Sequence, residues 1–273
     1  RKDRDPWAIL VSEVMGQQTP MARVVPRWRE WMSRWPTPAA LAAASPAEVL
    51  RAWDRLGYPR RALALQRAAT TITTIHDGEV PADPESLLAL PGVGPYTAAA
   101  VRAFAFRQRT AVLDTNVRRV LARLNGLERP ATPAPTRAEA QRAEGALPAS
   151  PEDSATWNEA LMELGATVCT PRPDCEACPL AELCGWRAAG YPASESPRPR
   201  SQAWAGTDRQ ARGRIMALLR DLEWATTDQA ALAGEVGGAV GQGERALAGL
   251  EADGLVSVED GRVRLGGAAI LGR

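Results

Sequence analysis

The chain has 273 residues, 45% of them apolar, which is enough for two domains and a packed core. It carries no run of about 18 apolar residues and no visible secretory signal, so we expect a cytoplasmic protein without a membrane partner. The formal net charge is +1, and the basic residues are almost all arginine: lysine occurs once, at Lys2, against 32 arginines. The sequence therefore offers no internal lysine for a Schiff base, and its single histidine, His76, excludes a histidine triad.

Apolar residues at helical spacing predict a series of helices along the first two thirds of the chain. These helices are expected at 7–16, 21–35, 46–57, 60–76, 84–90, 95–107, 116–125, 136–147 and 153–168. The third of them begins with a capping box at Ser45, followed by proline at the first helical position. No segment before residue 186 alternates with period two, so we expect residues 1–186 to form an all-α domain.

Residues 187–207 mix proline, serine, alanine and glycine without periodicity, which indicates a linker. Beyond it, residues 208–273 form a second domain with helices expected at 208–222, 227–234 and 242–253. The last segment alternates around Asp260 and Gly261 and predicts a β-hairpin, so this small α+β module resembles a winged-helix domain. Residues 208–267 hold seven arginines against ten acids, a balance of −3 that suits a groove-reading module poorly. A protein contact, a structural role and an auxiliary DNA contact all stay open for this module.

All four cysteines, Cys169, Cys175, Cys178 and Cys184, lie within sixteen residues in the pattern C-x5-C-x2-C-x5-C. Two disulfides are one arrangement, but nothing indicates secretion, and clustered cysteines in such a chain more often bind metal. Zinc is a second alternative, although its sites usually draw on two separated close pairs of ligands. One central close pair flanked by two outlying cysteines instead favours one [4Fe-4S] cluster with a thiolate on each iron.

The sequence LPGVG separates two predicted helices at residues 90–94. Glycine permits a positive φ and leaves backbone amides open at the start of the next helix, which is a natural phosphate site. An ordinary helix–turn–helix corner is the alternative. Between residues 102 and 123, however, six arginines surround a single acid, Asp114, and this pattern predicts DNA binding. The residues expected to grip the DNA are Leu90, Gly92, Val93, Gly94 and Arg118.

Several segments together carry a family resemblance. LPGVGPYTAAA, LDTNVRRVLARL and the four-cysteine pattern resemble the helix-hairpin-helix DNA glycosylases, which implies an all-α, two-lobed fold with an iron–sulfur loop at 169–184. Within that superfamily, SEVMGQQTP at 12–20, LGYPRRA at 56–62 and MELGATVCTPRPDCEACPL at 162–180 are similar to the MutY adenine DNA glycosylases. The resemblance runs from residue 4 to residue 186. It implies a base-excision-repair enzyme that removes adenine mispaired with 8-oxoguanine or guanine.

Two carboxylates are the candidates for the chemistry. Breaking a purine N-glycosidic bond requires a protonated leaving base and a stabilised sugar cation, and two carboxyl groups in different environments can divide this work. Glu13 lies among apolar residues that would raise its pKa, although its spacing alone equally allows a solvated helix face. Asp114 precedes a helix that it could cap while remaining ionised. The resemblance implies that Glu13 protonates the adenine and that Asp114 stabilises the oxocarbenium-like sugar.

The resemblance implies further roles at matching positions. Tyr96 stands where bifunctional members carry lysine, which implies a monofunctional enzyme, and Asn116 matches a residue near the sugar and the carboxylates. Tyr58 matches an aromatic that wedges beside the base opposite adenine, which helps the adenine to leave the stack. The residues matching contacts to the lesion pair are Gln17, Gln18 and Thr19. The expected partner is double-stranded DNA with a mispaired adenine, bound by a nucleoid-associated monomer.

Four features depart from the family pattern. Gly16 replaces a larger apolar residue, Pro59 stands where a second tyrosine is common, and the first cysteine gap is five residues instead of six. The small C-terminal module stands where the family usually carries a domain resembling a nucleotide pyrophosphohydrolase. A thymine glycosylase for G·T mismatches is the main rival, against which Glu13 followed by QQT argues. A non-catalytic lesion binder would lack the carboxylates, and a lyase would need the lysine.

Overall fold

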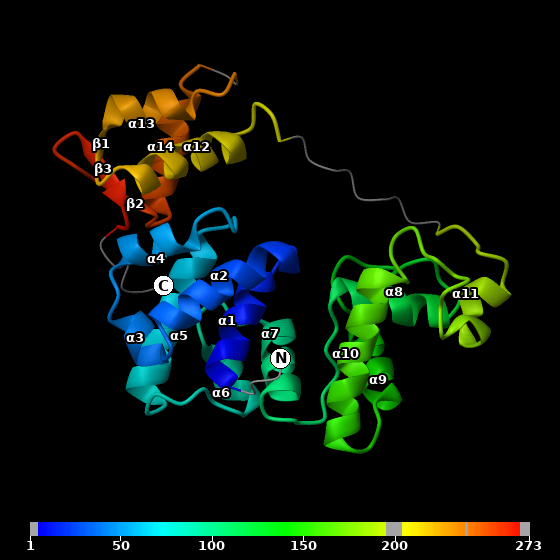
Figure 1. The fold of residues 1–273 in the computed structure, drawn as a ribbon. Helices are drawn as coiled ribbons and strands as arrows, with labels where there is room; N and C mark the ends of the chain where they lie inside the picture. The colour runs from blue at the N-terminus through cyan, green and yellow to red at the C-terminus, as the bar shows by residue number, and fades with distance from the viewer. Residues whose placement is uncertain (1–4, 195–203, 238–239, 268–273) are drawn as a thin grey trace. The chain divides into compact units, whose positions relative to one another are not determined.

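The computed structural model describes residues 5–194, 204–237 and 240–267 and is dominated by helices (Figure 1). The chain forms two compact units that interleave along the sequence. Unit 1 comprises Arg1–Glu13, Pro81–Ala89 and Val93–Pro199, and unit 2 comprises Val14–Val80, Leu90–Gly92 and Arg200–Arg273. The C-terminal module thus groups with the early helices in unit 2. Residues 195–203 of the predicted linker lie outside the described residues.

Unit 2 contains a group of early helices packed around tryptophan side chains. These helices are the end of α1 (Pro6–Gly16), then α2 (Met21–Arg34), α3 (Pro38–Ala42), α4 (Pro46–Trp53) and α5 (Arg60–Ile75). Trp31 and Trp53 are almost fully buried and meet edge to face at 5.5 Å between ring centroids. Ser45 and Glu48 form the predicted capping box of α4. Helix α3, a five-residue helix capped by Thr37, was not predicted from the sequence.

The C-terminal module of unit 2 combines three helices with a small antiparallel sheet. Its elements are α12 (Asp208–Asp221), β1 (Ala225–Thr226), α13 (Thr227–Gly234), α14 (Gln242–Ala252), β2 (Val256–Glu259) and β3 (Arg262–Leu265). The strand order is β1-β3-β2, with Ala225 and Val258 both opposite Val263. Asp260 and Gly261 have φ of 49° and 71°, which is the backbone a two-residue hairpin turn demands. The predicted hairpin is therefore present, with β1 added along its free edge.

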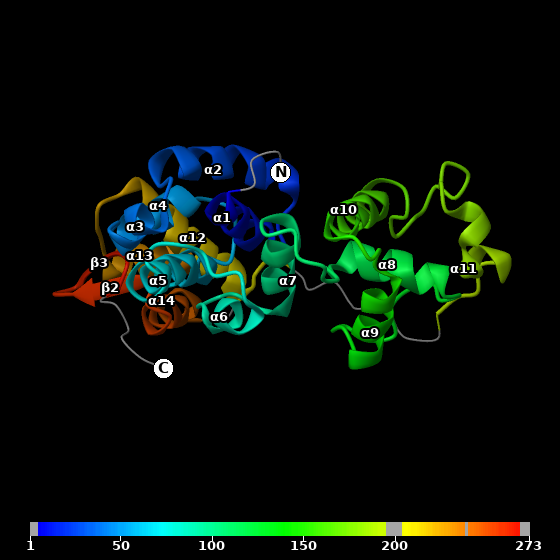
Figure 2. The same cartoon turned by 90° about the horizontal axis from the view of Figure 1, so that it is seen from below.

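Unit 1 contains α6 (Pro84–Ala89), α7 (Pro95–Phe104), α8 (Thr115–Leu124), α9 (Arg137–Ala146), α10 (Pro151–Thr167), the 3-10 helix η1 (Ala181–Leu183) and α11 (Gly185–Ala188). Helix α8 lies beside α10, as Figure 2 shows. The two approach closely at Gly165, where an added Cβ would come within 2.8 Å of the Asn116 backbone. Asn158 on α10 holds the segment before α8 by accepting from the Val112 amide at 2.9 Å. Among the described residues, no helix is long and apolar enough to span a membrane.

Candidate active site

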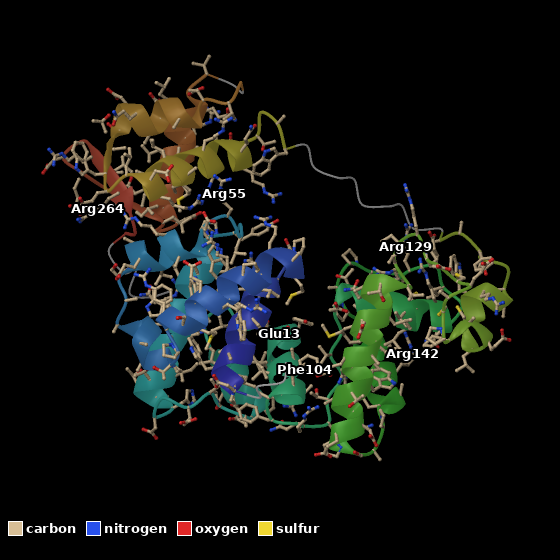
Figure 3. All side chains as sticks on the ribbon, in the orientation of Figure 1. Glu13, Arg55, Phe104, Arg129, Arg142 and Arg264 are labelled. Carbon is tan, nitrogen blue, oxygen red and sulfur yellow. The ribbon has the colours of Figure 1, made fainter. Side chains whose placement is uncertain are left out.

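Glu13 and Tyr96 come together although 83 residues separate them. Glu13 lies on α1, is 8% exposed and follows buried Val11 on the same helix (Figure 3). Tyr96 occupies the first turn of α7, directly after the glycine hairpin, and its hydroxyl donates to Glu13 Oε2 at 2.9 Å. The hydrogen bond ties a buried carboxyl group to the helix that begins at the hairpin. A sequestered carboxyl of this kind is suited to proton transfer.

Asp114 begins a chain of hydrogen bonds that ends at the cysteine loop. Its Oδ1 accepts from the Val117 amide at 2.6 Å, so it caps α8 as predicted. Its Oδ2 accepts from Asn116 Nδ2 at 3.0 Å, and Asn116 Oδ1 in turn accepts from Arg119 Nη2 at 2.8 Å. Arg119 also donates to the carbonyl of Cys169 through Nε at 2.7 Å. The carboxylate orientation is therefore determined by several fixed partners.

Arg119 is the buried member of this chain and was not singled out from the sequence. Its guanidinium also donates to the Gly165 carbonyl at 2.6 Å, which joins α8 to α10. Burial lowers the pKa of Arg119, and the neighbouring charge of Arg123 lowers it further. The arginine-rich pattern of the sequence indicated DNA contacts, whereas the acceptors of Arg119 are the Asn116 side chain and the carbonyls of Gly165 and Cys169.

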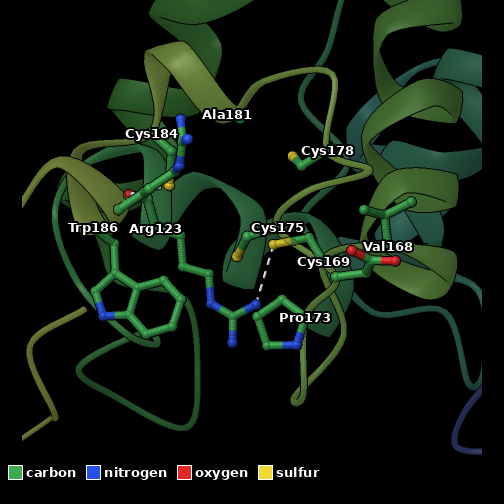
Figure 4. A pocket seen from close by; sticks show the side chains of 11 residues that line it. Arg123, Val168, Cys169, Pro173, Cys175, Cys178, Ala181, Cys184 and Trp186 are labelled. Atoms are coloured by element: carbon green, nitrogen blue, oxygen red, sulfur yellow. Dashed lines mark hydrogen bonds between the residues drawn. The ribbon is translucent and has the colours of Figure 1, made fainter. Parts of the chain in front are cut away.

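The four cysteines are unpaired and line one cavity (Figure 4). Cys169 is buried, and the Nη1 of Arg123 donates to its sulfur at 3.2 Å. The Arg123 guanidinium also lies 4.7 Å from the ring of Trp186, which closes another side of the cavity. A cationic donor aimed at the sulfur suits a thiolate, which is the form in which cysteine ligates metals. The residues present therefore fit a thiolate-bound metal group.

In the glycine hairpin, the apolar side chains are buried, whereas the backbone at its glycines is accessible. Leu90 and Val93 are 2% and 7% exposed, so their side chains belong to the core. Gly92 has a φ of +77°, and an added Cβ would lie 2.8 Å from the Cβ of Ala64. Gly94 precedes α7 and has open space where a Cβ would stand. At these four positions a DNA contact is therefore expected from backbone amides and not from the side chains of Leu90 and Val93.

One arginine, Arg61, donates hydrogen bonds to two turns. The first turn carries Gln17, Gln18 and Thr19, and the second carries Tyr58. Gln18 and Tyr58 both have positive φ, 54° and 48°, and remain exposed. Arg61 donates to the carbonyls of Val14, Gln17 and Gly57 and to the hydroxyl of Thr19. Thr19 is buried and donates to the carbonyl of Leu56 at 3.1 Å.

The shared arginine was missed by the sequence analysis, although it stands inside the quoted motif LGYPRRA. Its side chain is half-buried, and burial lowers the pKa of Arg61. Because its acceptors are mostly backbone carbonyls of two separate turns, Arg61 determines how these turns lie relative to each other. Such a contact cannot be predicted from the residue types at the acceptor positions, since every residue carries a backbone carbonyl.

The contacts of Arg118 differ from the DNA contact that was expected for it. It is only 6% exposed and forms an ion pair with Glu139 at 2.7 Å. Its remaining donors bind the carbonyls of Thr132, Pro133 and Ala134. The guanidinium is committed to the segment that leads into α9, so we remove Arg118 from the candidate DNA-binding residues.

Comparison with known proteins agrees with this geometry. The family model described as HhH-GPD superfamily base excision DNA repair protein matches residues 11–144. An adenine DNA glycosylase of Mycobacterium tuberculosis (strain ATCC 25618 / H37Rv) is 52% identical over 269 residues, covering 96% of this chain and 86% of the relative. One from Mycolicibacterium smegmatis is 50% identical over 271 residues, covering 98% and 90%. The structure of a thermostable thymine-DNA glycosylase superposes with a TM-score of 0.64 at 28% identity, covering 68% of this chain and 86% of that chain.

Proposed function

The chain belongs to the adenine DNA glycosylases of the HhH-GPD superfamily of base excision DNA repair proteins, and we propose that it hydrolyses the N-glycosidic bond of adenine mispaired with 8-oxoguanine or guanine. The observation that carries this proposal is the hydrogen bond from Tyr96 to Glu13, which joins a buried carboxyl to the hairpin helix. Tyr96 also stands where a lyase would need an amine nucleophile. We therefore propose base release without strand cleavage.

Glu13 is the proposed general acid of the reaction. Glu13 donates a proton to ring nitrogen 7 of the leaving adenine, a role that a carboxyl group shielded from bulk water can perform. Protonation turns the base into a neutral leaving group as the bond to the sugar breaks. Tyr96 orients the carboxyl through Oε2 and thereby directs the proton.

Asp114 is the proposed stabiliser of the sugar. As the glycosidic bond lengthens, positive charge develops at the anomeric carbon, and a fixed carboxylate lowers the energy of that charge. Asn116 and the Val117 amide hold both carboxylate oxygens in place before the reaction begins, so little reorganisation is needed. Water then completes the hydrolysis at the sugar.

The residues proposed to engage the lesion pair lie in unit 2. Gln17 and Gln18 contact the pair, the buried Thr19 holds their turn through the Leu56 carbonyl, and the exposed ring of Tyr58 enters the stack beside the base opposite adenine. Such a wedge offsets part of the energy of unstacking the adenine. The backbone amides of Gly92 and Gly94 bind phosphate at the hairpin. We propose that one monomer performs these steps on double-stranded DNA.

The four cysteines are the proposed ligands of one [4Fe-4S] cluster. All four cysteines line one cavity between α10 and α11, which would let them hold one metal group together. A larger cluster with one iron per thiolate suits that arrangement. The cluster would supply structural support for the loop between α10 and α11, and Arg123 would hydrogen-bond its Cys169 ligand. No catalytic step depends on it.

A duplex assay tests the proposal. Protein is incubated in single-turnover conditions with adenine opposite 8-oxoguanine, guanine or cytosine, and half of each sample is treated with hot alkali before strand analysis. We expect alkali-dependent cleavage at adenine opposite 8-oxoguanine and guanine. Glu13→Gln should lower the rate at least a hundredfold, since general acids contribute about 10²–10⁴ in rate. Glu163→Gln, an exposed glutamate of α10, is the matched control and should behave as wild type.

Three results would contradict the proposal in different ways. Absence of adenine release from every duplex would refute the activity. Cleavage without alkali would refute the monofunctional mechanism. Release of thymine from a G·T duplex in preference to adenine would instead favour the thymine glycosylase alternative, whose fold this chain shares.

A further inference from the structure

Five side chains of unit 2 form an alternating column of aromatic rings and guanidinium groups. Arg61 lies 5.3 Å from the ring centroid of Trp53 and 5.3 Å from that of Tyr58. Arg209 lies 5.1 Å from the centroid of Tyr58 and 5.2 Å from that of Trp204. These distances fall within the range of about 6 Å for cation–π attraction. The column runs from the buried Trp53 to the exposed Trp204, with Tyr58 at its centre.

The outer half of the column comes from the C-terminal module. Arg209 stands in the first turn of α12, and Trp204 precedes that helix. Asp253, the C-cap of α14, links the module to the early helices by pairing with Arg60 of α5 and with Arg212 of α12. The side chain of Asp253 is only 10% exposed, so this anchor is largely shielded from solvent. The anchor therefore links α12, which carries Arg209, to the start of α5, two residues after Tyr58.

We propose that Arg209 is a positioning residue for Tyr58, through which the C-terminal module contributes to recognition of the base opposite adenine. This inference rests on the proposed function, in which Tyr58 is the wedge. Tyr58 has a positive φ of 48° and is 44% exposed, so its ring needs contacts from outside its own turn to hold one orientation. Arg61 supplies such a contact from the core side, and Arg209 supplies the other. A wedge held in place before DNA binds loses less conformational entropy on binding.

The inference also explains how a module of negative net charge serves a DNA-binding protein. Seven arginines against ten acids between 208 and 267 make a general phosphate surface ineffective. The contact of one guanidinium group, that of Arg209, with the Tyr58 ring does not require a basic surface on the module. The alternative, in which Arg209 binds a phosphate directly, predicts an effect that is independent of Tyr58.

A double-mutant cycle on binding separates these possibilities. The probe is a duplex whose target deoxyadenosine carries 2′-fluorine, which resists glycosidic cleavage because it destabilises the sugar cation. Dissociation constants are measured with this base opposite 8-oxoguanine and opposite cytosine. Arg209→Ala should weaken the 8-oxoguanine complex about two- to fivefold, as expected for an exposed cation–π contact. It should leave the cytosine complex nearly unchanged, whereas a general folding defect would weaken both.

In a Tyr58→Leu background, Arg209→Ala should have no further effect on either complex. Arg214→Ala, an exposed arginine later on α12, is the matched control and should bind as wild type. An additive loss in the double variant, an equal loss with both duplexes, or no loss in Arg209→Ala would each overturn the inference. If the wild type releases no adenine, the proposed function fails. If it releases adenine normally but the cycle is additive, only the present inference fails.

Discussion

Asp114 combines two roles that one substitution can separate. It caps α8 through Oδ1, and it is proposed to stabilise the sugar by its charge. Asparagine is as good an N-cap as aspartate, so Asp114→Asn should change the free energy of unfolding by less than about 0.5 kcal/mol. The loss of charge should lower the single-turnover rate of adenine release by about 10²–10³. Thermal unfolding and the duplex assay measure the two effects, and a stable variant of full activity would show that Asp114 is only a cap.

Gly165 permits the contact that holds Asn116 against α10. An added Cβ would lie 2.8 Å from both the Cβ and the carbonyl oxygen of Asn116, so one of the two helices must shift. Gly165→Ala should destabilise the protein by about 1–3 kcal/mol, the usual effect of overpacking. It should also lower the rate of adenine release, because Asn116 orients Asp114.

Gly145→Ala on α9 is the matched control for Gly165→Ala. Nothing lies within 4 Å of a Cβ added at Gly145, so alanine should leave activity unchanged there and stabilise the helix by about 0.5–1 kcal/mol. Chemical denaturation of both variants gives the comparison. Equal stability changes in the two would show that the helix contact at Gly165 is looser than described.

The two turns that carry Gln18 and Tyr58 depend on Arg61. Replacing it by methionine should leave several carbonyls of these turns without a donor, which costs about 1–3 kcal/mol for a buried group. Arg61→Met should therefore lower the unfolding midpoint and weaken binding to the 8-oxoguanine duplex. Arg67→Met, an exposed arginine of α5, is the control. Unchanged DNA affinity in Arg61→Met would separate this arginine from DNA recognition.

The elements themselves were largely predictable from the sequence. Periodic apolar residues and caps located the long helices, and the hairpin at Asp260 followed from alternation and turn residues. Helix α3 and strand β1 were missed because five and two residues are too short for a period to be seen. Their presence is decided by packing in the folded chain.

The candidate site was predictable only residue by residue. Family motifs named Glu13 and Tyr96, but local pattern could not show that they meet across 83 residues. Arg119 and Arg61 were missed, and Arg118 was misplaced, for one physical reason. Arginines near a predicted DNA surface look alike in sequence, whereas the fold decides which guanidinium finds buried carbonyls and which faces solvent.

The loop between α10 and α11 is the element most dependent on the proposed cluster. Among its described residues, regular structure is limited to the three-residue η1, so its cysteine ligands would provide most of its order. Removing iron by oxidation and chelation should raise amide hydrogen exchange in residues 169–188. Exchange in α5 should stay as before, because that helix belongs to unit 2. Unchanged protection of the loop without iron would contradict a structural cluster.

At the scale of the whole molecule, Asp253 links the C-terminal module to the early helices of unit 2. It pairs with Arg60 and Arg212 while only 10% exposed. Asp253→Asn would leave two guanidinium groups facing each other without a neutralising charge, which should cost about 2–3 kcal/mol. Glu251→Gln, at an exposed acid in the last turn of α14, removes the same charge without disturbing the anchor.

The anchor variant should therefore have two measurable effects. Limited proteolysis should cut the module faster in Asp253→Asn than in Glu251→Gln, because a loosened module opens more often. Binding to the 8-oxoguanine duplex should weaken at least as much as in Arg209→Ala, since the anchor delivers Arg209 to Tyr58. Because both effects depend on the same displacement, Arg209→Ala should add little further loss in the Asp253→Asn background. A module that is cleaved faster without any loss of mispair binding would show that its docking serves stability alone.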